Sequence, residues 1–173
     1  MKPKGKIIMI RGNSGSGKTS LAKALQASIG PGTLLLSQDM LRREMLFVSD
    51  GPDTQTISFF IHLLKYGQEQ NQWVIVEGIL HAEWYKSVFE FIQNHYETIF
   101  AYYYDLSFEE TVKRHQTRAK NQDFGVDTMR RWWLEQDFLP QMKESILNEA
   151  VSLEEALEII LTDIGYTGAF NEK

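Results

Sequence analysis

Residues 12–20 combine glycines, hydroxyl side chains and a lysine in an order that suits a bound phosphate. Their spacing fits the pattern G-x-x-x-x-G-K-[ST]. Glycine lets the backbone curl until successive N–H groups converge on phosphate oxygens, and a helix starting there adds its positive dipole end. The residues expected to bind the phosphates are Gly12, Asn13, Ser14, Gly15, Ser16, Gly17, Lys18, Thr19 and Ser20.

Two members of this loop have chemistry of their own. Lys18 is expected to reach the β- and γ-phosphates, and the Thr19 hydroxyl is expected to bind Mg²⁺. The alternative is a flexible glycine turn that fits the pattern by accident. An apolar stretch at 6–10 precedes the loop, and leucine and isoleucine recur at helical spacing after it. A phosphate-binding loop needs this strand-to-helix context, which favours it over the accidental turn.

An aspartate follows the second apolar stretch, residues 33–36. Asp39 lies in the sequence Ser-Gln-Asp-Met-Leu-Arg. Transfer of a phosphoryl group to an alcohol benefits from a carboxylate that orients the hydroxyl and accepts its proton. Alternatively, Asp39 is an acid in the first turn of a helix, where the dipole favours it. Arg42, one turn later, could bind an anion of the acceptor or be an exposed helix arginine.

The third apolar stretch, residues 73–76, ends in another acid. Glu77 is expected to hold Mg²⁺ through water or to contact the acceptor, although an acid here could also cap or pair with the next helix. His81 follows shortly and could line the acceptor pocket. The four histidines of the chain show no metal-ligand spacing.

Arginines cluster around a polar segment at 120–127. Arg114 and Arg118 are four residues apart and so share one helix face. They could stabilise the transferred phosphoryl group, or merely complement the C-terminal end of a helix. Arg130 or Arg131 could swing in from the other side of the segment. We expect residues 118–131 to form a lid that excludes water from the reaction.

Composition excludes several classes of protein. The 173 residues are 43% hydrophobic and 24% charged, which is typical of a globular protein. There is no cysteine, so disulfides and thiolate chemistry are excluded. A net charge of −5 argues against broad nucleic-acid binding. No apolar run is long enough for a membrane span, and a cytoplasmic location is expected.

The order of elements predicts the fold. Apolar stretches alternate with segments of helical periodicity, which indicates parallel βαβ units and a three-layer α/β/α sandwich with a five-stranded parallel sheet. Residues 1–173 are expected to form a single domain. Ligands of such sheets bind at the carboxyl ends of the strands, where most of the candidate residues lie. The strands are predicted at 6–10, 33–36, 73–76, 98–104 and 145–147.

These features together resemble the small P-loop kinases, which include adenylate, shikimate, gluconate and polynucleotide kinases, chloramphenicol phosphotransferases and zeta-type toxins. The resemblance rests on the loop and on the stretches SQDMLR, VIVEG and RHQTR. It implies the P-loop NTPase fold with sheet order 2-3-1-4-5, ATP and Mg²⁺ as cofactors, Asp39 as the base, and Arg114 and Arg118 as transition-state cations. The EGIL sequence at 77–80 departs from adenylate kinases, which carry an arginine there, and the paired acids of shikimate kinases are absent.

The sequence therefore predicts an ATP-dependent kinase that phosphorylates a hydroxyl of a small molecule. Lys18, Asp39, Arg114 and Arg118 are its expected catalytic residues. Asp39, Arg42, Glu77 and His81 would bind the acceptor, and Thr19 and Glu77 the metal. The alternatives are a nucleoside, nucleotide or polynucleotide 5′-hydroxyl kinase, and an ATP-binding switch without kinase activity. The identity of the acceptor, the choice between ATP and GTP, and the oligomeric state are left open.

Overall fold

A computed structural model of the chain describes residues 5–117 and 124–168. Its five strands form one sheet, in the order β2-β3-β1-β4-β5. All four strand pairs are parallel, which confirms the predicted sheet and strand order. The strands are β1 (Lys6–Gly12), β2 (Leu34–Ser37), β3 (Trp73–Gly78), β4 (Thr98–Tyr104) and β5 (Ser145–Leu147).

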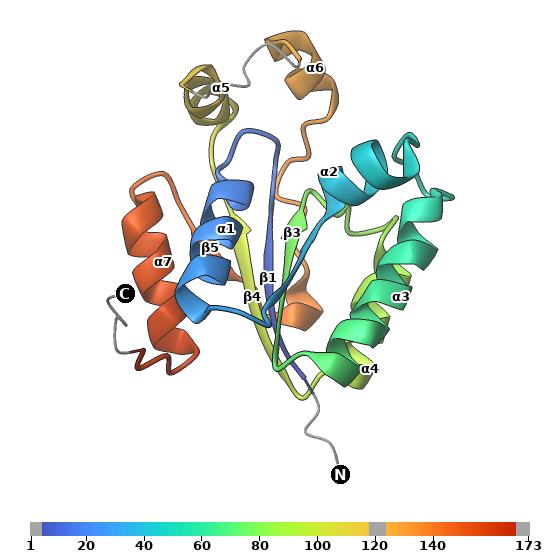
Figure 1. Ribbon diagram of the computed structural model, residues 1–173. Coiled ribbons are helices and arrows are strands. Elements are labelled where there is room, and N and C mark those ends of the chain that lie inside the picture. The colour runs from blue at the N-terminus through green and yellow to red at the C-terminus, as the bar shows by residue number, and fades with distance from the viewer. Residues whose placement is uncertain (1–4, 118–123, 169–173) are drawn as a thin grey trace.

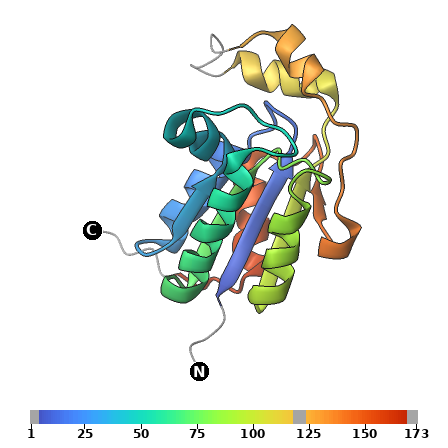
Figure 2. The same ribbon diagram turned by 90° about the vertical axis from the view of Figure 1, so that its right-hand side faces the viewer.

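Helices cover both faces of the sheet (Figures 1 and 2). Helices α1 (Lys18–Ile29) and α7 (Leu153–Asp163) lie on one face, and α3 (Gln55–Gln70) and α4 (Lys86–His95) on the other. Each face has its own apolar core. In β1, Ile7 and Met9 enter the core under α3 and α4, whereas Ile8 and Ile10 enter the core under α1 and α7. This explains why β1 is apolar at consecutive positions.

Apart from the 3₁₀ turn before β5, the remaining helices lie at the carboxyl edge of the sheet, at the top of Figure 1. The short helix α2 (Gln38–Met40) and the π-helix η1 (Leu41–Leu46) follow β2. Helix α5 (Phe108–Gln116) follows β4, and α6 (Val126–Arg131) lies beside it; a 3₁₀ turn, η2 (Pro140–Met142), precedes β5. None of the described helices is both long and apolar enough to cross a membrane.

Two local sequence predictions need correction. Met129, Trp132 and Trp133 predict a helix that ends near Pro140, whereas α6 ends at Arg131 and an irregular segment continues from Trp132. The sequence also predicts capping boxes between Ser107 and Glu110 and between Ser152 and Glu155. The first of these is only half formed. The Ser107 hydroxyl accepts from the Glu110 N–H, but the Glu110 carboxylate instead binds Arg114, 2.8 Å from its Nε. The box between Ser152 and Glu155 is complete, as predicted.

A fully buried arginine joins three segments at the carboxyl edge. Arg11, at 0% exposure, forms ion pairs with Asp137 at 2.8 Å and with Glu144 at 2.7 Å. Its Nε and Nη2 donate to the Leu80 carbonyl at 3.2 and 2.9 Å. Leu80 has a φ of 44°, a left-handed conformation that is strained for a branched side chain. Arg11 therefore ties the end of β1 to the turn after β3 and to the segment before β5.

The two acids are held from other sides as well. Asp137 accepts from the Ala82 N–H at 2.8 Å, and Glu144 accepts from the Leu139 N–H at 2.7 Å. Burial raises the pKa of Glu144, while the Arg11 guanidinium acts to lower it. One cation thus compensates the buried carboxylate of Glu144 and the partly buried carboxylate of Asp137, so the cluster depends strongly on Arg11.

We expect Arg11→Leu to cost about 3–5 kcal/mol of unfolding free energy, because it leaves the buried Glu144 and the partly buried Asp137 without a cation. Without Arg11, the pKa of Glu144 rises further above its unfolded value. A raised folded-state pKa gives stability at low pH that is lost as pH rises. The free energy of unfolding that Arg11→Leu loses relative to the unmodified chain, measured by urea unfolding, should therefore be larger at pH 8 than at pH 5.

The double variant Arg11→Leu with Glu144→Gln is the matched control. It removes one of the two uncompensated charges, so part of the lost stability should return at pH 8 and the pH dependence should weaken. An equal deficit at both pH values with no recovery in the double variant would contradict this account.

Candidate functional site

The loop between β1 and α1 has the backbone conformation that its glycines predict. Gly12, Gly15 and Gly17 have φ angles of 144°, 82° and 108°, in the region that side chains rarely adopt. A Cβ atom at Gly15 would lie 2.6 Å from the Thr111 carbonyl oxygen of α5, and one at Gly12 would lie 2.9 Å from the Tyr104 Cβ of β4. Substitution is thus disfavoured both by conformation and by close packing.

Lys18 is buried and directed back across the loop. Its Nζ donates to the Asn13 carbonyl at 2.7 Å and to the Ser16 hydroxyl at 3.2 Å. It is only 7% exposed. No side-chain cap bonds the N-terminus of α1, where the cap position is Gly17. A helix N-terminus of this kind, with a lysine beside it, is suited to bind an anion.

Thr19 and Glu77 meet at the edge of the sheet. The Thr19 hydroxyl donates to the Glu77 carboxylate at 3.1 Å. Glu77 is 2% exposed, and its register partners are Ile10 of β1 and Ser37 of β2. Within the described residues no three His, Cys, Asp or Glu side chains gather into a metal cage. Mg²⁺ in phosphoryl-transfer sites needs only one or two protein ligands beside phosphate and water, so this hydroxyl and carboxylate fit it.

Asp39 lies in α2, on the other side of the sheet centre from β4. Its side chain is 63% exposed, and its Oδ1 accepts from Arg42 Nη2 at 3.0 Å and from Arg43 Nε at 3.1 Å. Arg42 is more buried, with its Nη1 3.4 Å from the Val48 carbonyl. The structure thus brings Asp39 and Arg42 together in a local ion pair and adds Arg43; the predicted roles of Asp39 and Arg42 stay predictions.

The segment that carries Asp39 is held by a buried polar cluster. The Gln38 Nε2 donates to Asp50 and to the Tyr85 hydroxyl, both at 2.9 Å, and its Oε1 accepts from the Leu80 N–H at 2.9 Å. Tyr85 in turn donates to Asp50 at 2.7 Å, and burial raises the pKa of the Tyr85 hydroxyl. These bonds fix the start of α2 against the turn after β3, so Asp39 projects from a rigid base.

Arg114 contacts the phosphate-binding loop directly. Its Nη1 donates to the Ser16 carbonyl at 3.0 Å, its Nε binds Glu110 at 2.8 Å, and its guanidinium lies 5.9 Å from the centre of the Tyr104 ring. Arg118 lies outside the described residues. The placement of Arg114 therefore fits its predicted role beside the transferred phosphoryl group.

The other candidate side chains lie apart from this group. Arg130 is exposed and packs over the Phe108 ring at 4.0 Å, and Arg131, also exposed, donates to the Thr128 hydroxyl at 3.1 Å. His81 stacks on Trp84 at 4.4 Å. Among the described residues no hydrogen bond or ion pair joins any of these three side chains to Asp39, Glu77 or the loop.

Asn13 has a structural role that the sequence pattern did not indicate. Its side-chain amide donates to the Leu134 carbonyl at 2.7 Å, and its Oδ1 accepts from the Leu134 N–H at 2.9 Å. The loop is thereby clamped to the segment after α6. The pattern leaves this position unspecified, so only the contact reveals its use. Arg11 was missed for a similar reason, although a charged residue ending a buried strand was a visible signal.

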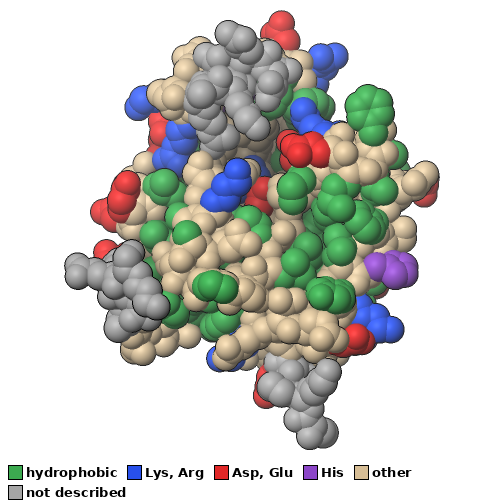
Figure 3. Space-filling view, in the orientation of Figure 1, with side chains coloured by type: hydrophobic (Ala, Val, Ile, Leu, Met, Phe, Trp, Pro, Cys, Tyr) green, Lys and Arg blue, Asp and Glu red, His purple; other side chains and the backbone are tan. Residues whose placement is uncertain are grey.

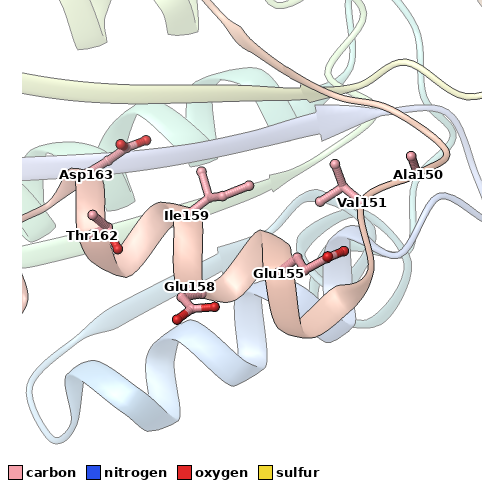
Figure 4. Close-up of a pocket in the computed structure, with 7 residues that line it drawn as sticks. All are labelled: Ala150, Val151, Glu155, Glu158, Ile159, Thr162 and Asp163. Carbon is pink, nitrogen blue, oxygen red and sulfur yellow. The ribbon is translucent and has the colours of Figure 1, made fainter.

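Figure 3 shows both basic and acidic side chains around the upper part of the molecule, and hydrophobic side chains over α3 at the right. A separate hollow of about 520 Å³ lies along α7 (Figure 4). Glu155, Glu158 and Asp163 are among its lining residues, and these carboxylates would repel phosphate. The hollow is therefore not a second nucleotide site.

Solved structures with the same fold include several kinases. The tunicamycin resistance protein of Deinococcus radiodurans matches with a TM-score of 0.66 and 16% identity, over 94% of this chain and 97% of that one. The APS kinase of Mycobacterium tuberculosis, solved with AMPPNP and APS, matches with a TM-score of 0.66 and 18% identity, over 91% and 96%. A gluconokinase of Sinorhizobium meliloti matches with a TM-score of 0.62 and 14% identity, over 97% and 100%.

Sequence comparison identifies the family. A search of curated proteins gives no match. A family model described as an AAA domain, AAA_33, matches residues 7–137, which include the phosphate-binding loop, Asp39, Glu77 and Arg114. Because this match spans more than half of the chain, and because the fold is that of the small P-loop kinases, the protein belongs to the AAA_33 family of P-loop domains.

Proposed function

We propose that the protein is a Mg²⁺-dependent kinase that transfers the γ-phosphoryl group of ATP to a hydroxyl of a small molecule. The observation that carries the proposal is the contact between Thr19 and Glu77 at 3.1 Å, beside Lys18 at the N-terminus of α1. It supports the proposal because a hydroxyl and a buried carboxylate that could hold Mg²⁺ lie beside a lysine that could bind phosphate. The fold shared with gluconokinase and APS kinase supports a phosphotransferase.

The reaction assigns a task to each residue. Asp39 orients the acceptor hydroxyl and takes its proton as the acceptor oxygen bonds to the γ-phosphorus. The bond between that phosphorus and the bridging oxygen breaks, and ADP leaves with the electron pair. Lys18 and Arg114 lie where they can offset the charge on the phosphates, and Mg²⁺ held at Thr19 and Glu77 would neutralise the β- and γ-oxygens. Arg118 remains a candidate for the same task.

The acceptor would enter between α2 and the phosphate-binding loop. The 63% exposure of the Asp39 side chain leaves it open to a solute, and Arg42 beside it would favour an acceptor that carries an anionic or strongly polar group. Residues 118–131 remain our candidate for a lid. We further propose a cytoplasmic location, where ATP is supplied.

The nucleotide part of the proposal is tested by Lys18→Ala. Loss of this cation should remove most of the affinity for Mg-ATP, measured by calorimetry and by the shift in melting temperature with AMPPNP. Lys23→Ala, an exposed lysine in the same helix, is the matched control and should bind as the unmodified chain does. Unchanged binding by the Lys18 variant would refute the phosphate-binding loop.

The kinase part is tested by Asp39→Asn, which keeps the shape of the side chain but removes the proton acceptor. A thermal-shift screen of metabolites with Mg²⁺ and AMPPNP first supplies the acceptor. The variant should bind Mg-ATP normally and lose about a hundredfold or more in turnover.

Glu109→Gln, another exposed acid in the first turn of a helix, is the control for a simple dipole effect and should retain full turnover. Full activity in the Asp39 variant would remove the base assignment. If the Asp39 variant also loses nucleotide binding, Asp39 is better assigned to the Mg²⁺ site. If no metabolite raises ATP consumption above its intrinsic rate, the regulatory switch is the better account.

A further inference from the structure

One arginine outside the predicted set joins the two sides of the candidate site. Arg43 Nε lies 3.1 Å from Asp39 Oδ1. Its guanidinium also lies 5.6 Å from the centre of the Phe124 ring and 5.3 Å from that of Trp132. These distances are those of an ion pair and of two cation–π contacts. Arg43 therefore connects the segment after β2 with the segment around α6.

The aromatic pair is itself firmly placed. Phe124 and Trp132 meet edge to face at 5.2 Å, and Phe124 stacks on His115 of α5 at 4.7 Å. His115 Nε2 lies 3.1 Å from the Phe124 carbonyl oxygen. Helix α5 also carries Arg114, which donates to the Ser16 carbonyl. A continuous series of contacts thus runs from the phosphate-binding loop through α5 and the aromatic pair to Arg43.

The way in which Arg43 binds Asp39 suits a base. Arg42 and Arg43 both bond to Oδ1, and within residues 5–117 and 124–168 no hydrogen bond involves Oδ2. One carboxylate oxygen is thus fixed while the other can receive the acceptor hydroxyl. Arg42 is also bound to Val48 of its own segment, whereas Arg43 has its further contacts across the site. Of these two arginines, Arg43 is therefore the one through which the position of the aromatic pair can affect the orientation of the Asp39 carboxylate.

We propose that Arg43 is a positioning residue that orients the Asp39 carboxylate when Phe124 and Trp132 pack against it. The inference rests on the proposed function, since it assumes Asp39 as the base. An exposed ion pair and partly exposed cation–π contacts are individually weak, so they orient Asp39 only in combination. Turnover would then be efficient only while Phe124 and Trp132 pack against Arg43.

A mutant cycle on turnover tests the proposal. Arg43→Ala should lower kcat by about tenfold to a hundredfold through misorientation of the base, while the Kd for AMPPNP changes less than about twofold. Trp132→Leu should also lower kcat, and Arg43→Lys, which keeps the charge and a weaker cation–π contact, should recover part of the loss.

The double variant of Arg43→Ala and Trp132→Leu should be no slower than Arg43→Ala alone, because both changes break the same contact between Arg43 and Trp132. In the Asp39→Asn background, Arg43→Ala should have no further effect.

Lys86→Ala is the matched control, because Lys86 forms an exposed ion pair with Glu90 on α4 at 3.9 Å; it should leave kcat unchanged. Additive effects of Arg43→Ala and Asp39→Asn, or normal turnover in Arg43→Ala, would overturn the proposal while Asp39 stays the base. Full turnover in Asp39→Asn would instead overturn the base assignment and the role of Arg43 together. A rise in the KM for the acceptor with kcat unchanged would show that Arg43 binds the acceptor directly, and would also overturn it.

Discussion

The arrangement of the candidate site depends on the central position of β1 in a parallel sheet. Strand β1 is hydrogen-bonded to β3 on one side and to β4 on the other. The phosphate-binding loop, which follows β1, therefore lies between Glu77, near the end of β3, and the turn that leads from β4 into α5. The carboxyl ends of all parallel strands lie at the same edge of the sheet. The sheet therefore brings together residues that are far apart in the chain, and these residues need no direct contacts with one another for this.

Polar contacts then fix the loops that this edge would otherwise leave loose. Arg11 connects the end of β1 to Leu80, Asp137 and Glu144, and Asn13 clamps Leu134. Gln38 fixes the start of α2 to the turn after β3. Buried polar networks of this kind are stabilising only when their members are satisfied. They hold the two sides of the site at a defined separation, which in-line phosphoryl transfer requires.

The two sides of the proposed site differ in their exposure. The nucleotide side consists of a loop closely packed against Tyr104 and Thr111, with a buried lysine. The acceptor side consists of an exposed aspartate on a short helix that continues as a π-helix, a geometry often found at functional sites. A rigid phosphate cradle and an open acceptor side would let members of one fold act on different alcohols.

The sequence by itself determined the sheet, its strand order through family resemblance, and the phosphate-binding loop. These follow from apolar stretches and from glycines whose backbone angles are a local matter. Tertiary structure decided the rest. The sequence could not predict three contacts: those of Arg11 with two acids, of Asn13 with Leu134, and of Arg43 with Phe124 and Trp132. Each of them joins segments that are 80 or more residues apart or depends on where α6 ends. Local spacing specifies which side chains can do chemistry, whereas packing between distant segments specifies which of them meet.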